Sequence, residues 1–113
     1  MATARASGSA PGSYNAVFRH VVLLRWKPEA TAEQRAAVET GLATLPGLIP
    51  EIRAYTIGTD AHVNEGNYDL VVVADFDTVD GYFAYRDNAD HQAVIREHIA
   101  PILAERAAIQ HAL

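Results

Sequence analysis

The sequence contains no cysteine, and its lysines and arginines never form a run. Without cysteine, a disulfide framework, a thiolate metal site and a cysteine nucleophile are all excluded. The formal net charge is -5, so the chain also lacks the basic footprint that nucleic-acid binding requires. We therefore discount DNA, RNA and anionic membranes as partners.

Long apolar runs are also missing. No stretch approaches the roughly 20 apolar residues that cross a bilayer, and the N-terminus lacks the apolar core of a signal peptide. We therefore expect a cytoplasmic protein. The chain has no glycine-rich phosphate loop, no Gly-x-Ser-x-Gly elbow and no recognisable pair of catalytic carboxylates, and we expect no cofactor.

What the chain does contain is enough apolar material for one core, since half of its 113 residues are hydrophobic. Residues 1–16 are mostly small and polar, and we interpret them as a disordered N-terminal tail. Residues 17–113 are expected to form a single domain.

Periodicity predicts the elements of this domain. Alternating or β-branched runs indicate strands over residues 17–27, 52–57 and 68–76, and residues 107–113 form a weaker candidate. A capping box at Thr31 starts a helix that should end at Pro46-Gly47, and Asp77-Thr78 should cap a second helix. A third helix follows from His91 and should be split in two by Pro101.

The order strand, helix, strand, strand, helix, helix, strand fits two β-α-β units. This order predicts an α+β, ferredoxin-like fold with a four-stranded antiparallel sheet and helices on one face. Yet the strands at 17–27 and 68–76 are apolar on both faces. Their second face, with Val21, Leu23, Val71 and Val73, would stay uncovered, so we expect a homodimer whose two sheets pack together.

Four segments together resemble the stress-responsive A/B barrel (Dabb) family, over roughly residues 18 to 106: residues 20–28, 45–52, 68–73 and 85–91. The resemblance implies a dimeric α/β barrel. Most such proteins have no assigned reaction, but some, such as a plant olivetolic acid cyclase, close polyketide chains by aldol chemistry without a cofactor. The matching positions imply catalytic roles for Tyr85 and His91, with His20 as a further candidate. The carboxylate near the catalytic histidine of that cyclase has no obvious counterpart here.

Each candidate also has a simpler interpretation. An imidazole suits proton abstraction near neutral pH and a phenol can donate to a developing oxyanion, but His91 could instead cap a helix and Tyr85 could simply pack. His20, on the helix-facing side of its strand, either lines a pocket or satisfies a core hydrogen bond. His91 and His98 are seven apart, which is not the spacing of metal ligands on a helix, so we predict no metal site.

Three functions remain open. In the first, the domain binds a small aromatic or polyketide-like molecule in an apolar pocket between sheet and helices. In the second, it is a cofactor-independent aldol-type cyclase or lyase; in the third, a structural dimer with a filled core. A pocket of a few hundred Å³ that reaches Tyr85 and His91 would separate them. We expect its apolar walls to be Val22, Leu24, Val38, Leu42, Leu70, Val72 and Ala74.

Overall fold

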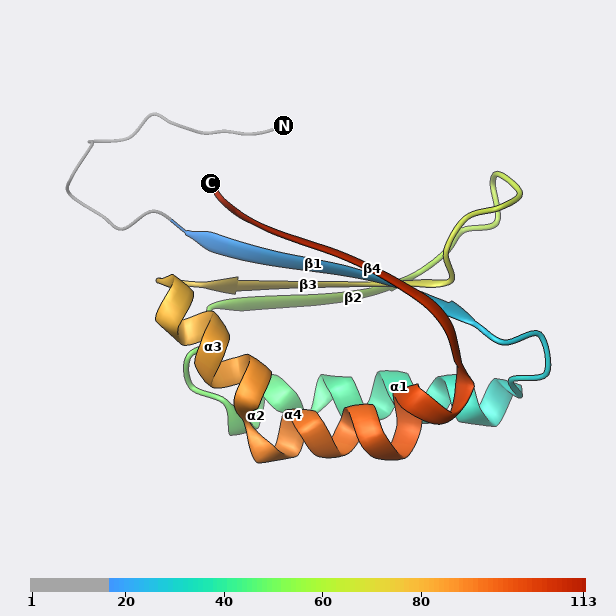
Figure 1. Ribbon diagram of the computed structural model, residues 1–113, viewed down its shortest axis with the longest axis horizontal. Helices are drawn as coiled ribbons and strands as arrows, with labels where there is room; N and C mark the ends of the chain where they lie inside the picture. The colour runs from blue at the N-terminus through green and yellow to red at the C-terminus, as the bar shows by residue number, and fades with distance from the viewer. Residues whose placement is uncertain (1–16) are drawn as a thin grey trace.

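Four antiparallel strands form one sheet in the order β2-β3-β1-β4 (Figure 1). Along the chain they are β1 (Phe18–Trp26), β2 (Ala54–Thr59), β3 (Leu70–Phe76) and β4 (Leu103–Ala112). This computed structural model describes residues 17–113, so the tail predicted for residues 1–16 lies outside the described part. The strands with two apolar faces, β1 and β3, are central, and the more polar β2 is an edge strand.

The helices all lie on one side of this sheet (Figure 1). They are α1 (Ala32–Ala43), the short α2 (Leu45–Leu48), α3 (Val79–Asp87) and α4 (Ala89–Val94), and α4 continues into a π-helical turn, η2 (Ile95–Ile99), and a 3-10 turn, η3 (Ala100–Ile102). The predicted ferredoxin-like plan is confirmed. None of the helices among residues 17–113 is long and apolar enough to span a membrane.

Polar caps set where three helices begin. At α1, Thr31 and Gln34 form the predicted capping box, each side chain bonded to the other's backbone N–H. The Thr78 side chain caps α3 by accepting from the Gly81 N–H. Asn88 ends α3 and caps α4, so the chain turns sharply between them. The helix boundaries that matter for the candidate site are therefore fixed by short local signals.

Several predicted boundaries were wrong. Pro46 and Gly47 do not end helical structure but lie inside α2, because proline fits the first turn of a helix. Pro101 lies beyond the end of α4, in the 3-10 turn η3. The wider π-helical turn η2 connects α4 to this tighter turn. The last strand is ten residues long, beginning at Leu103 instead of residue 107, because pairing with β1 imposes an extended conformation on an alanine-rich segment.

The two faces of the sheet differ in burial. The helix-facing side chains of β1 and β3 join residues of α1, α3 and α4 in one continuous core. The close approach of α1 to α4 favours a glycine at position 41, where an added Cβ would lie 3.3 Å from the Val94 side chain and would push it aside by a few tenths of an ångström. On the opposite face Val21, Leu23 and Val73 are only half-buried, which leaves an apolar surface in the described chain.

Two ion pairs frame that apolar surface. Arg19 donates two hydrogen bonds to the Asp75 carboxylate at 2.7 and 2.9 Å, and Asp75 is itself buried. Arg25 lies 2.6 Å from Glu105 and also stacks over the Tyr68 ring. Charged pairs at both ends of an apolar sheet surface are typical of an interface that binds its partner in one fixed alignment.

Candidate functional site

Tyr85 lies between the two histidines that the sequence singled out. Its ring stacks on the His91 ring with centroids 4.0 Å apart, and the centroid of the His20 ring lies 6.1 Å from that of Tyr85. All three side chains are largely shielded from solvent, with exposures of 2% for Tyr85, 4% for His20 and 9% for His91. The structure thus brings the three predicted catalytic residues into one cluster.

Their positions follow from the turn between α3 and α4. Tyr85 is in the last turn of α3, and the Asn88 side chain accepts hydrogen bonds from the backbone N–H groups of Asp90 and His91 at 2.8 and 3.3 Å. Asn88, and not His91, is therefore the helix cap. This places His91 in the first turn of α4 with its ring turned back against Tyr85.

A backbone carbonyl fixes the tautomer of His91. Its Nδ1 lies 3.2 Å from the Arg86 carbonyl oxygen, and because a carbonyl can only accept, Nδ1 carries the proton. Nε2 then keeps its lone pair. Burial lowers the pKa of His91, so the ring is neutral near pH 7. The carbonyl does here what a carboxylate does in many histidine sites: it orients the ring.

His20 is held differently. The Gln110 amide on β4 donates to its Nδ1 at 2.9 Å, so the proton of the neutral ring is on Nε2. Burial, helped by the positive charges of Arg106 and of a protonated His91, lowers the pKa of His20 from 6.5 to about 4. His20 is therefore a neutral donor under physiological conditions, a role unlike that of His91.

Tyr85 has a second phenol as its partner. The Tyr85 and Tyr55 hydroxyl oxygens lie 3.0 Å apart, with either able to donate. Burial, together with Tyr55, raises the pKa of Tyr85, and burial likewise raises the pKa of Tyr55. Both phenols stay protonated, so Tyr85 can act only as a hydrogen-bond donor or acceptor and not as a base.

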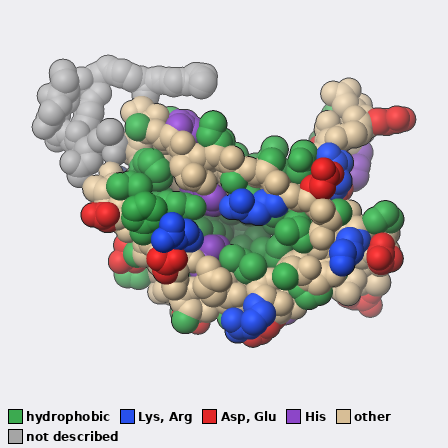
Figure 2. Space-filling model, in the orientation of Figure 1, with side chains coloured by type: hydrophobic (Ala, Val, Ile, Leu, Met, Phe, Trp, Pro, Cys, Tyr) green, Lys and Arg blue, Asp and Glu red, His purple; other side chains and the backbone are tan. Residues whose placement is uncertain are grey.

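The cluster borders a hollow on the helix side of the edge strand β4. Pairing with β1 puts Arg106, Ala108 and Gln110 on that side, and all three are exposed even though they face the helical layer. Figure 2 shows this face of the molecule hollowed between β4 above and the helices below, with a mainly hydrophobic floor. Histidine side chains and a Lys or Arg side chain lie at its margin in that view.

The seven predicted wall residues belong to the packed core and are 0 to 8% exposed. Two other concave regions, of about 470 and 600 Å³, lie at the opposite end of the strands and contain neither Tyr85 nor His91. Of the seven predicted residues, only Leu70 lines one of them.

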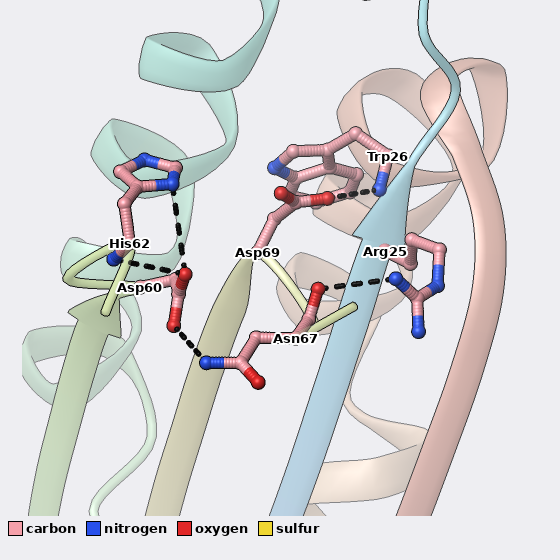
Figure 3. A network of polar contacts seen from close by, with 6 residues as sticks. All are labelled: Arg25, Trp26, Asp60, His62, Asn67 and Asp69. Carbon is pink, nitrogen blue, oxygen red and sulfur yellow. Dashed lines mark hydrogen bonds and ion pairs between the residues drawn. The ribbon is translucent and has the colours of Figure 1, made fainter. Parts of the chain in front are cut away.

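A polar network holds the loop beside those two regions in place (Figure 3). Asp69 accepts from the Trp26 backbone N–H at 2.8 Å, while Asp60 accepts from the His62 backbone N–H and from the Asn67 amide. The loop is thus tied to β1 by its own side chains. Within residues 17–113, no three histidines, aspartates or glutamates converge as metal ligands would.

Sequence reasoning missed Tyr55, Arg106 and Gln110. Tyr55 is on the edge strand β2, where alternation alone does not say which face meets the helices. Arg106 and Gln110 belong to β4, whose alanine content hid its length. Had residues 103–112 been read as a strand, their spacing of four would have placed Arg106 and Gln110 on one face.

A four-stranded antiparallel sheet with helices on one face and a buried tyrosine–histidine cluster defines the class, an α+β protein of ferredoxin-like fold. Within that class the chain belongs to the stress-responsive A/B barrel (Dabb) family, whose family model matches residues 18–111. No curated protein matches the chain.

Solved structures agree with this assignment. A dimeric ferredoxin-like protein of unknown function from Thermobifida fusca is 42% identical, with a TM-score of 0.81 over 94% of this chain and 100% of that one. A hydroxynitrile lyase from Passiflora edulis is 16% identical, with a TM-score of 0.75 over 86% of this chain and 93% of that one. A Dabb family protein from Mesorhizobium loti is 17% identical, with a TM-score of 0.71 over 85% and 95%. The last two show the fold alone.

Proposed function

We propose that this protein is a homodimer that binds a small aromatic or polyketide-like molecule in the hollow between β4 and the helices. The observation that carries the proposal is the position of the Tyr85–His91 pair: a cluster with an unshared imidazole lone pair borders a mainly hydrophobic hollow. Apolar walls with a few convergent polar groups are the usual make-up of small-molecule sites.

The exposed side of β4 is where such a ligand would lie. Val22, the most exposed of the seven predicted wall residues at 8%, pairs with Ala108 of β4. Because the Ala108 side chain is only a methyl group, it leaves space beside Val22 for a ligand. The six other wall residues belong to the same packed core as Val22. A carbonyl group of the ligand would point toward His91, and its apolar part would follow β4.

Dimerisation is supported by the sheet face that no helix of the described chain covers. Val21, Leu23, Val71 and Val73 lie side by side on neighbouring strands and are half-buried before any partner is added. The 42% identical relative is described as dimeric. Packing two such faces together would remove an apolar patch and leave the ligand site free on the other side of the sheet.

Catalysis is the second candidate function, and the tautomer of His91 favours it. A neutral imidazole with a free Nε2 can take a proton from a carbon next to a ligand carbonyl, and a phenol or the His20 Nε2–H can donate to the oxygen that becomes negative. The resulting enolate carbon could attack a second carbonyl, as in an aldol-type cyclase. The lyase of similar fold from Passiflora edulis is an enzyme by name.

Binding and proton abstraction can be tested with one probe, 4-phenylbutan-2-one, an aromatic methyl ketone. Titration should shift the backbone NMR signals of Ala108 and Gln110 in the hollow and leave those of the distant loop at His62 unchanged. Failure to shift the β4 signals at millimolar probe would contradict the binding proposal.

Exchange of the ketone's α-protons with D2O then separates binding from catalysis. If His91 is a base, His91→Ala should reduce exchange to the buffer rate while the affinity stays within about tenfold. The control His62→Asn, on an exposed loop, should match the wild type. Probe binding without any exchange above buffer would leave the binding function and eliminate the catalytic one.

A further inference from the structure

Arg106 is set apart from the other arginines by its lack of a partner. Among residues 17–113 six arginines are paired: five with a carboxylate and one, Arg35, with a backbone carbonyl. Arg106 alone forms no ion pair or side-chain hydrogen bond with the described part of the chain. Its guanidinium is nonetheless fully charged at neutral pH and presents five donors.

Its position makes this unpaired charge informative. Arg106 projects from β4 on the helix side, four residues from Gln110, which is bonded to His20. Its charge also lies close enough to lower the pKa of both His20 and His91. A cation therefore lies on the helix side of β4 near two imidazoles that burial keeps neutral, and it forms no ion pair with a carboxylate of residues 17–113.

We propose that Arg106 selects ligands that carry a carboxylate at one end of an apolar body. A guanidinium binds a carboxylate through two parallel hydrogen bonds. The neutral His20 ring, which is bonded to Gln110 on the same face of β4, carries a further N–H donor. An apolar molecule with an acid group matches both the mainly hydrophobic floor and the unpaired cation. This inference rests on the proposed ligand site and adds the chemical class of the ligand.

The size of the expected preference follows from the exposure of Arg106. Charge-assisted hydrogen bonds are stronger than neutral ones, but solvent screens a pair at an exposed site, so we expect a preference of about tenfold and not more. Raising the ionic strength should reduce it.

A matched pair of probes tests the inference: 4-phenylbutanoate and its neutral amide, 4-phenylbutanamide, which have nearly the same shape. Calorimetric or NMR titration of the wild-type protein should give about tenfold tighter binding of the acid. Arg106→Gln should weaken binding of the acid by about tenfold and leave binding of the amide within twofold. The control Arg96→Gln removes an exposed arginine already paired with Glu97 and should change neither affinity.

The histidines supply a second readout. A bound carboxylate next to Arg106 should raise the NMR-measured pKa of His20 and His91, and the amide should not, because only the acid offsets the positive charge.

Three results would overturn the inference. Equal affinity for acid and amide would mean that the hollow binds without selecting charge, and the binding proposal would survive. If Arg96→Gln weakened binding of the acid as much as Arg106→Gln does, only the net charge of the protein would matter. If neither probe shifts the β4 signals, the ligand site and its selectivity are both wrong.

Discussion

The buried His20 should make the folded protein sensitive to mild acid. The pKa of His20 falls from 6.5 to about 4 on folding, chiefly because burial removes water from the ring. Below pH 6.5 the His20 ring takes up a proton in the unfolded chain but stays neutral in the folded protein. Stability must therefore decrease as the pH falls through this range and level off near pH 4.

The size of this loss of stability can be worked out for a pH range in which most carboxylates do not titrate. Between pH 7.5 and 5.5 the His20 contribution alone should reduce the free energy of unfolding by about 1 kcal/mol, out of a maximum of about 3 kcal/mol at lower pH. The result depends little on the folded value, because that value lies well below 5.5. His91, whose pKa is also lowered by burial, acts in the same direction.

Urea unfolding at fixed protein concentration, followed by the fluorescence of the buried Trp26, gives the free energy at each pH. Between pH 7.5 and 5.5, His20→Gln should lose about 1 kcal/mol less of its free energy of unfolding than the wild type, even if it is less stable at both pH values. The control His62→Asn, whose imidazole is exposed, should keep the wild-type difference. A His20→Gln variant with an undiminished acid loss, or an NMR pKa of His20 at 6.5 or above, would refute the reasoning.

Two further changes test the assembly and the helix start. Val73→Lys places a charge at the centre of the uncovered sheet face and should weaken association by several kcal/mol. Sedimentation should then show monomers at a concentration where the wild type is dimeric. A wild type that is already monomeric at micromolar concentration would contradict the dimer. Thr31→Ala removes the hydroxyl that accepts from the Gln34 backbone N–H, one of the two hydrogen bonds of the α1 capping box, and should lower the free energy of unfolding by about 1 kcal/mol in urea titrations. Thr31→Ser should lose much less, and equal losses would argue against the cap.

Local signals predicted most of the fold. The Thr31 capping box and the cap at Thr78 are short-range hydrogen-bond patterns, so the sequence alone indicates where α1 and α3 begin. The apolar residues on both faces of β1 and β3 are visible in the sequence, and they fit the inner positions of these strands, because an inner strand with both faces covered tolerates them. These features depend on neighbours in sequence or on alternation, which are both readable without a structure.

The features that sequence reasoning missed depend on tertiary pairing. The β4 segment is rich in alanine, which disfavours strands, and it is extended because it pairs with β1 over its length. Its register decides that Gln110 meets His20 and that Arg106 lies on the helix side of β4, and no local pattern states a register. For the same reason the Tyr55–Tyr85 contact, between β2 and α3, could not be anticipated.

Burial keeps the two histidines neutral, and the charge of Arg106, which lowers their pKa further, would couple ligand binding to their basicity. In the free protein, Arg106 and burial both hold the pKa of His91 down, so Nε2 is available but weakly basic. A carboxylate bound to Arg106 would offset the positive charge and raise that pKa toward the neutral range, where a general base is most effective. In the proposed complex, an acidic ligand would thus strengthen the base beside it, and a neutral ligand of the same shape would be bound next to a weaker one.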